Sequence, residues 1–468
     1  MGLHLSLIVG YSAALMGLGL ILGRRVRSAG EFLIGGRRLG AGLLFATMLA
    51  SNIGAGSTVG ASATAYLHGV VAWWWVGSAA LGCALLAWRV GPALRRQAAA
   101  ANLQTVGEWL EHRYDHRVRA VISVLLWTGG LFILASQLIG LGWILQAVTG
   151  VPTWVGCVLG GIVITTYFAA GGLLTAAWVN VVQLAVKLIG FAVAVPLLVH
   201  WAGGASAIAA VRAEDAAYWH PRVADVLGYI VLLAPAFVVS PGLLQKVFAA
   251  RDDEAVRRGV GWNAVGLALF AAVPLVIGII VRGYAPNLGP GGAALALPIA
   301  FMQGLPPLAG ALGLAAVFSA EVSAADAVLL MLTTSLTHDL YRRFLVPSAT
   351  EPQLLRLARL ATAGSGTLGI LLAVTSQDVV ATLSVFYALL GVSLFVPVVA
   401  GLYVPRTSAA GALIAIGAGV VVMTAVHVAT GGRGIGWWAP APAGLCAATC
   451  LWAASLVVAP RPAAAVVS

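Results

Sequence analysis

Two short stretches of the chain place small, polar and helix-breaking residues inside otherwise apolar sequence. The first runs from Ala50 to Thr58 and contains two serines, an asparagine and two glycines. The second carries Pro235 and, a few residues later, Ser240, Pro241 and Gly242. Glycine and proline weaken a helix, so we expect the backbone to unwind at both places. Unwound backbone has free carbonyl and amide groups that can bind small ions or polar solutes.

Three ionisable residues also lie within apolar runs, namely Lys187, Glu321 and Asp326. An ammonium group deep in a bilayer is unfavourable unless it is paired or has a function. Either carboxylate could neutralise Lys187 in a static ion pair. The same groups could instead exchange protons near neutral pH, and a third interpretation has the lysine extend away from both. The residues alone leave these three interpretations open.

The composition excludes a soluble globular protein. The 468 residues are 61% apolar and 9% charged, with a mean hydropathy of +0.99, whereas soluble domains carry about 25% charged residues. The net charge of +11 is spread between apolar runs, so we expect the lipid bilayer as a partner and no nucleic acid. The four cysteines form no disulfide or metal pattern. With no catalytic nucleophile or phosphate loop in an aqueous setting, we predict no enzyme and no cofactor other than a coupling ion.

Apolar windows long enough to cross a bilayer predict an all-α integral membrane protein with about 13 transmembrane helices. Their approximate limits are 4–23, 40–65, 69–91, 119–148, 152–170, 173–201, 225–249, 259–282, 309–337, 355–376, 379–403, 408–429 and 437–459. Of the 26 Lys and Arg residues, 21 then lie in loops on one side, Lys246 among them. Because basic loops face the cytoplasm, we predict a multi-pass protein of the plasma (inner) membrane, with its N-terminus outside and its C-terminus cytoplasmic.

The two interrupted spans, 40–65 and 225–249, are five spans apart, which gives the halves that contain them opposite orientations in the membrane. This arrangement is typical of the inverted repeats of secondary transporters, where broken helices meet at the midplane. Irregular backbone at that depth must line a cavity. At the outer start of the third span, we expect Trp73, Trp74 and Trp75 to form an aromatic belt, with gating of an outer vestibule as the alternative.

Several blocks of the sequence, in order, resemble the sodium:solute symporter family. They comprise Glu31 to Arg38, Ala50 to Gly60, Trp73 to Gly77, Gly171 to Leu173, Trp178 to Gln183, Pro241 to Gly259 and, most specifically, Ala320 to Arg343. The resemblance implies a ten-helix core of two inverted five-helix repeats with discontinuous helices. It places the core at 40–403, with repeat one at 40–201 and repeat two at 225–403. An extra N-terminal helix and cytoplasmic loop would then occupy 1–39, and two extra helices with a short tail 404–468.

The same resemblance implies a sodium site. Its ligands would be backbone carbonyls at Ala50, Ile53 and Ala320 and hydroxyls at positions 323 and 324. Only Ser323 carries a hydroxyl here, because position 324 is alanine. The family has an aspartate where this chain has Asn180, and an apolar residue where it has Lys187. A lost ligand, a lost anion and a gained cation all predict that Lys187 occupies or adjoins the space of the sodium ion.

The resemblance also implies which residues contact the solute. These candidates are Ser51, Asn52, Gly56, Ser57, Gln137, Phe237, Ser240 and Tyr387. Gly56 and Ser57 are small, where sugar-binding relatives carry longer polar groups, so a small carboxylate or amino acid is favoured over a sugar. We therefore expect a secondary active transporter for a small organic solute that works by alternating access and has an altered sodium site. The alternatives are proton-coupled or sodium-independent transport through Lys187, with Asn180, Glu321 and Asp326 as further coupling candidates, and a membrane sensor with a transporter fold. The oligomeric state is left open.

Overall fold

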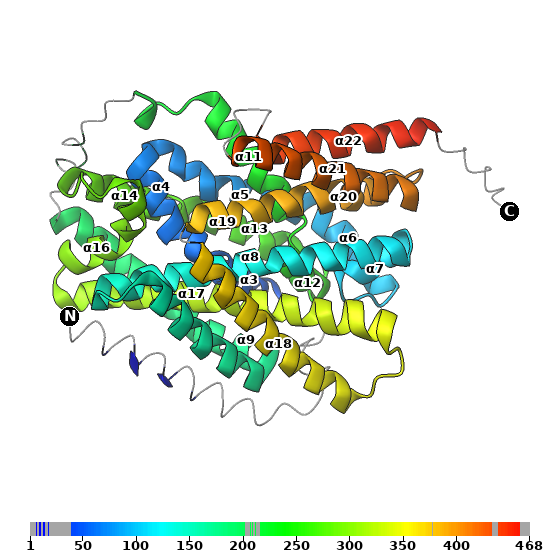
Figure 1. Cartoon of the computed structure of the whole chain (residues 1–468), viewed down its shortest axis with the longest axis horizontal. Coiled ribbons are helices and arrows are strands. Elements are labelled where there is room, and N and C mark those ends of the chain that lie inside the picture. The colour runs from blue at the N-terminus through cyan, green and yellow to red at the C-terminus, as the bar shows by residue number, and fades with distance from the viewer. Residues whose placement is uncertain are drawn as a thin grey trace.

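The computed structural model describes residues 39–201, 216–376, 378–432 and 439–458, with the single positions 6, 9, 10, 13, 14, 17, 206, 208 and 211. The side chains of 167, 170–181, 290 and 351 lie outside this description. Within the described residues the regular structure is helical, apart from one isolated bridge between Leu39 and Ala250. The predicted all-α fold class is confirmed (Figure 1).

The named helices cover most of the described chain. They are α3 (Ala41–Asn52), α4 (Val59–His68), α5 (Trp73–Leu85), α6 (Gly91–Ala100), α7 (Val106–Arg113), α8 (His116–Thr149), α9 (Thr153–Trp201), α11 (Val223–Val238), α12 (Pro241–Phe248), α13 (Asp253–Phe270), α14 (Ala272–Tyr284), α15 (Gly289–Gly292), α16 (Ala296–Gln303), α17 (Pro307–Thr334), α18 (Glu351–Thr375), α19 (Val379–Leu390), α20 (Val396–Tyr403), α21 (Ala409–Thr430) and α22 (Pro440–Val458). Short helical turns join several of them: η1 (Ala55–Ser57), η2 (Gly69–Ala72), η3 (Leu86–Val90), η4 (Ala216–Tyr218), η5 (Ala293–Leu295), η6 (Ser335–Leu345) and η7 (Gly391–Phe395).

Ten helical segments of the described residues are long and apolar enough to cross a membrane. The predicted count of about 13 is not confirmed. The predicted span 4–23 falls largely outside the described residues, and 40–65 divides into two short helices. The predicted spans 152–170 and 173–201 both lie within α9. The division into an N-terminal segment, two repeats and a C-terminal pair stays a prediction.

The first predicted break is present between α3 and α4. Helix α3 ends at Asn52, and Gly54 is extended, with φ −147° and ψ −164°. A Cβ atom on Gly54 would lie 2.6 Å from the Cβ atom of Ala324 and 2.7 Å from Oε1 of Gln137. Glycine is therefore required here because α8 and α17 approach the backbone closely.

The second predicted break separates α11 from α12. Helix α11 contains Pro235 and ends at Val238, and α12 begins with Pro241 at its first position. Proline cannot donate a backbone hydrogen bond, so it is tolerated at a helix start and weakens a helix interior. The sequence pattern and the structure agree on this break.

The helices around the breaks form one packed core. Helix α13 packs against α3 and α5, α14 packs against α4, and α5 packs against α11. Helix α17 crosses the middle of the molecule in contact with α8, α9 and α18 (Figure 1). Helices α21 and α22 lie side by side at one edge. The broken helices are thus enclosed by continuous ones.

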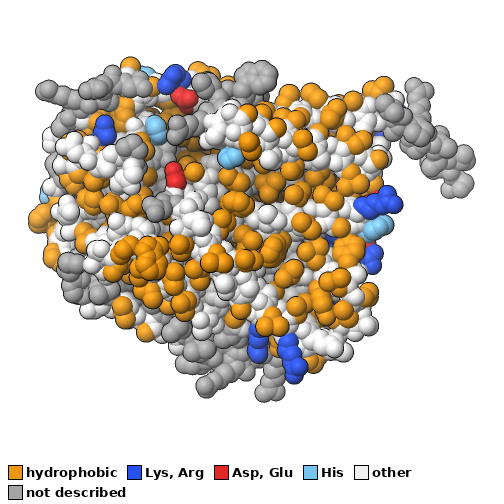
Figure 2. All heavy atoms as spheres, in the orientation of Figure 1, with side chains coloured by type: hydrophobic (Ala, Val, Ile, Leu, Met, Phe, Trp, Pro, Cys, Tyr) orange, Lys and Arg blue, Asp and Glu red, His pale blue; other side chains and the backbone are white. Residues whose placement is uncertain are grey.

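Large apolar side chains cover much of the outer surface, as the face in Figure 2 shows. Leu269 is 72% exposed, Val428 76% and Val457 86%. An apolar exterior of this extent is unfavourable in water and favourable against lipid tails. The exposed face therefore agrees with a membrane protein.

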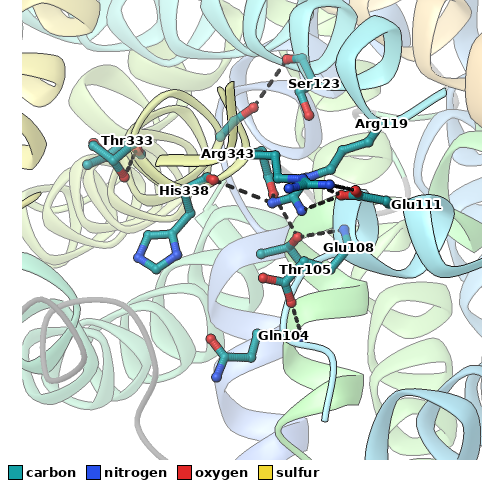
Figure 3. A network of polar contacts seen from close by, with 12 residues as sticks. Gln104, Thr105, Glu108, Glu111, Arg119, Ser123, Thr333, His338 and Arg343 are labelled. Atoms are coloured by element: carbon teal, nitrogen blue, oxygen red, sulfur yellow. Dashed lines mark hydrogen bonds and ion pairs between the residues drawn. The ribbon is translucent and has the colours of Figure 1, made fainter. Parts of the chain in front are cut away.

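A polar network ties α7, α8 and η6 together (Figure 3). Arg119 donates to Glu111 at 2.8 Å and to Asp339 at 2.7 Å. Thr105 donates to the same Asp339 oxygen at 2.9 Å, and Arg343 pairs with Glu111. These segments belong to loops predicted to be cytoplasmic, and the structure places them together.

Removal of Arg119 should destabilise the fold strongly. In Arg119→Met, the buried Asp339 loses its charged partner, and breaking a buried pair costs about 3–5 kcal/mol. We expect a clearly lower apparent Tm for purified protein in detergent. Arg258→Met is the matched control, because Arg258 pairs with Glu254 on the exposed surface, where a pair contributes about 0–1 kcal/mol. Equal shifts for both variants would contradict the structural role of Arg119.

Glu111 should make this network sensitive to acid. Partial burial acts to raise the pKa of Glu111, but hydrogen bonds from Arg343 and Arg119 outweigh it and hold the pKa below its usual value. The resulting stability is present above the unfolded pKa of about 4.3 and is lost as the pH falls through the lower folded pKa. The difference in apparent Tm between wild type and Glu111→Gln should therefore shrink below about pH 4. A difference that grows on acidification would refute this assignment.

Candidate solute and ion sites

A cavity of about 100 Å³ lies between the two breaks. All eight residues predicted to contact the solute line it, from both broken helices and from the helices that face them. They are Ser51, Asn52, Gly56, Ser57, Gln137, Phe237, Ser240 and Tyr387. The structure therefore brings the solute candidates into one place.

Side chains satisfy the backbone polar groups that the first break sets free. The Ala55 amide donates to Oε1 of Gln137 at 2.8 Å, and the Gly54 amide donates to the Ser57 hydroxyl at 3.0 Å. The Thr58 hydroxyl oxygen lies 2.9 Å from the Gly54 carbonyl oxygen. Buried backbone groups without partners are unfavourable, especially in a membrane. The polar residues of this stretch thus stabilise the unwound backbone as well as line the cavity.

Aromatic rings form one wall of the cavity. The ring centre of Tyr387 lies 5.5 Å from that of Phe237 and 6.2 Å from that of Trp75. Trp75 is only 3% exposed and lines the cavity. The aromatic belt predicted for this tryptophan is therefore wrong, because its indole packs inward against other rings.

The ammonium group of Lys187 lies between the first break and α17. Its Nζ donates to the Ala50 carbonyl at 2.6 Å, to the Ile53 carbonyl at 3.4 Å and to the Ser323 hydroxyl at 2.5 Å. Lys187 is fully buried. The Ser323 hydroxyl is also 3.1 Å from the Ala320 carbonyl. Four of the five predicted sodium-site residues therefore surround one ammonium group, directly or through Ser323.

Position 324 offers no ligand. Ala324 lines the solute cavity, and its methyl group faces Gly54. The family pattern has a hydroxyl residue at this position. In this chain the space beside the break is apolar on that side.

The carboxylates of α17 do not pair directly with Lys187. Among the described residues, no ion pair includes this lysine. Glu321 is fully buried and accepts a hydrogen bond from the Thr58 hydroxyl at 2.8 Å. Asp326 is also buried. The interpretation of a static ion pair is not supported in this arrangement, and the side chain of Asn180 lies outside the described residues.

Sequence reasoning missed Lys246. The loop count assigned it to a cytoplasmic loop, but the structure places it on α12, at the border of the cavity. Its Nζ donates to the Thr47 carbonyl at 2.8 Å and to the Ser51 hydroxyl at 2.5 Å. The signal that could have located it was its distance from the break, since Lys246 follows Pro241 by little more than one helical turn.

Comparison with known proteins identifies the family. The model of the sodium:solute symporter family matches residues 32–419. The chain belongs to this family. The family and the proteins similar to this chain are transporters, so this chain is a membrane transporter and not an enzyme.

Relatives of this transporter carry several small organic solutes. The sodium/pantothenate symporter of Escherichia coli (strain K12) is 29% identical over 445 residues, which cover 89% of this chain and 88% of the relative. The sodium/sialic acid symporter NanT of Aliivibrio fischeri is 22% identical and covers 90% of this chain and 86% of its own length. A solved structure of a Na⁺-coupled sialic acid symporter, substrate-bound and outward-open, has a TM-score of 0.79 at 20% identity and covers 98% of both chains. At this identity the structural likeness shows the fold alone.

Loss of the Gln137 amide should weaken the first break. In Gln137→Met, the buried Ala55 amide loses its acceptor, which costs about 1–3 kcal/mol. We expect a lower apparent Tm in detergent. Gln245→Met is the control, because Gln245 lies outside the solute cavity and its side chain forms no hydrogen bond with the described residues. An unchanged Tm for Gln137→Met would show that the break does not need this side chain.

Proposed function

We propose that this transporter moves a small organic carboxylate or amino acid across the plasma membrane without a sodium ion at the family site, because Lys187 supplies the positive charge there. The observation that carries the proposal is the set of contacts made by Nζ of Lys187, at 2.6 Å from the Ala50 carbonyl and 2.5 Å from the Ser323 hydroxyl. Alternating access would expose the cavity between the breaks to each side in turn.

Charge repulsion and a lack of free ligands both disfavour a sodium ion beside Lys187. A small hard cation needs several oxygen ligands, and three of the four oxygens that the family pattern assigns in this chain already accept hydrogen bonds from the ammonium group. A second monovalent cation within about 4 Å would be repelled by several kcal/mol in a buried setting. The missing hydroxyl at Ala324 removes one further ligand. The two cations would therefore exclude one another.

Proton coupling is the second candidate, and Glu321 favours it. Its Oε2 atom is buried and has no hydrogen-bond partner among the described residues, while Oε1 is bound by Thr58. A carboxyl group in this state could take up a proton when the break rearranges. The family match supports a third candidate, ordinary sodium coupling, because relatives such as the pantothenate symporter are named for sodium.

The cavity lining and three of the relatives support a solute that carries a carboxylate. The lining combines aromatic rings with small polar groups such as Ser51, Asn52 and Ser57. Pantothenate, proline and sialic acid, which the names of three relatives state, all carry a carboxylate. We propose that the solute is a small carboxylate rather than a neutral sugar.

We also propose that the N-terminus lies outside and the C-terminus in the cytoplasm.

Counterflow in proteoliposomes, with external sodium and pH varied independently, tests the coupling. Small carboxylates such as pantothenate and proline serve as the first labelled probes. We expect flux that does not depend on sodium. Strict sodium dependence that persists in Lys187→Ala would overturn the role of Lys187.

The double variant Lys187→Leu with Ala324→Ser should gain sodium dependence. It removes the tethered charge and restores the missing hydroxyl, so a sodium ion regains both space and ligands. Ala324→Ser alone is the matched control and should stay independent of sodium, because Lys187 still fills the site. A double variant whose flux ignores sodium would show that the assigned site is wrong.

A further inference from the structure

The solute cavity has an unbalanced charge. Among its described lining residues Lys246 is the one Lys or Arg, and no Asp or Glu lines it. Glu321 and Asp326, the nearby acids of α17, are not part of the lining. The remaining residues are apolar, aromatic, amide or hydroxyl residues. A cation that borders a cavity without an acid is a site of positive potential.

The hydrogen bonds of Lys246 leave capacity for a further acceptor. An ammonium group has three N–H donors, and Nζ of Lys246 uses two of them, on the Thr47 carbonyl and the Ser51 hydroxyl. Both acceptors are neutral, and no ion pair of the described residues includes Lys246. The side chain is partly exposed, because it borders the cavity. A carboxylate in the cavity could therefore bind the third donor.

Two further charges strengthen this potential. Lys187 is buried nearby in contact with the same broken helix, at Ala50 and Ile53, and it also lacks an ion-pair partner among the described residues. The N-terminal end of α12, at Ser240 and Gly242, also lines the cavity, and a helix N-terminus carries a partial positive charge. The cations and the helix end all favour an anion in the cavity.

We infer that Lys246 binds the carboxylate of the transported solute and thereby selects anionic solutes over neutral ones. This inference rests on the proposed transport function and names the residue that recognises the solute. The bound carboxylate would form a charge-assisted hydrogen bond with Nζ, stronger than one between neutral groups. The aromatic wall of Trp75, Phe237 and Tyr387 would then pack against the apolar part of the same solute.

A purely structural role for Lys246 makes a different prediction. Its contacts join α12 to α3, so it could serve only to hold these two half-helices together. In that case, loss of Lys246 would weaken the binding of charged and neutral compounds alike. A carboxylate-binding role affects only the charged compounds. Matched pairs of compounds that differ at the carboxyl group therefore separate the two roles.

The test uses the full-length protein in detergent and follows tryptophan fluorescence, because Trp75 lines the cavity. The probes are pantothenate with pantothenol and propionate with propionamide. Wild type should bind the carboxylates at least about tenfold more tightly than their neutral partners. Lys246→Met should lower carboxylate affinity about 10- to 100-fold and leave the neutral partners unchanged. Lys246→Arg should restore the preference.

Two more variants keep the test decisive. Lys246→Gln retains an N–H donor for the Thr47 carbonyl but no charge, so it replaces Lys246→Met if that variant does not fold. Gln245→Met, on the same helix but outside the solute cavity, should keep the preference of wild type. The inference is overturned if no carboxylate of the set binds wild type. It is also overturned if the neutralised variants lose charged and neutral probes equally.

Counterflow of the same probes separates this inference from the transport function. Carboxylate binding that depends on Lys246, without flux, would overturn the transport proposal and support the role of Lys246. Flux of neutral probes that is equal in wild type and Lys246→Gln, without a preference for carboxylates, would overturn the role of Lys246 and support transport.

Discussion

Backbone that leaves the helix inside a membrane must find hydrogen-bond partners within the protein, and the rest of this structure depends on that constraint. At the first break, Gln137 and Ser57 bind the free amides of Ala55 and Gly54. Carbonyls at Ala50 and Ile53 receive the ammonium group of Lys187. The same groups that satisfy the backbone therefore form the walls of a polar chamber in an apolar protein.

The position of the chamber follows from the helices that surround the breaks. Helices α13 and α14 support the two halves of the first broken helix, while α5 packs on α11. Helix α17 contributes Ser323 at one side of the break and Ala324 at the cavity, one residue apart. One turn of a single helix thus contributes both to the contacts of Lys187 and to the cavity lining. A movement of α17 at Ser323 therefore also moves Ala324 in the cavity wall.

Much of this arrangement could be predicted from the sequence. Clusters of glycine, serine and proline in apolar runs located both breaks, because few other patterns weaken a buried helix so strongly. The two departures from the family pattern, Lys187 and Ala324, both lie beside the first break. The ten-helix repeat division and the sodium-free coupling stay predictions.

Other features could not be predicted because they depend on packing between distant segments. The count of about 13 spans is not confirmed, because predicted spans join or divide in the structure, as in α9. Lys246 was assigned to a loop because basic residues near span ends usually face water, and its inward direction depends on acceptors in α3. The sequence predicts a surface position for Trp75, but its inward packing depends on contacts with Tyr387 and Tyr229, which lie far away in the sequence.

The burial of each ion pair determines how strongly dissolved ions weaken it. Among the described residues, the pairs of Arg119, Arg343 and Arg95 join separate helices. Mobile ions screen such contacts over about 8 Å at physiological ionic strength. Because buried pairs are screened much less than exposed ones, salt would weaken the pair of Arg343 with Glu111 more than the buried pair of Arg119 with Asp339.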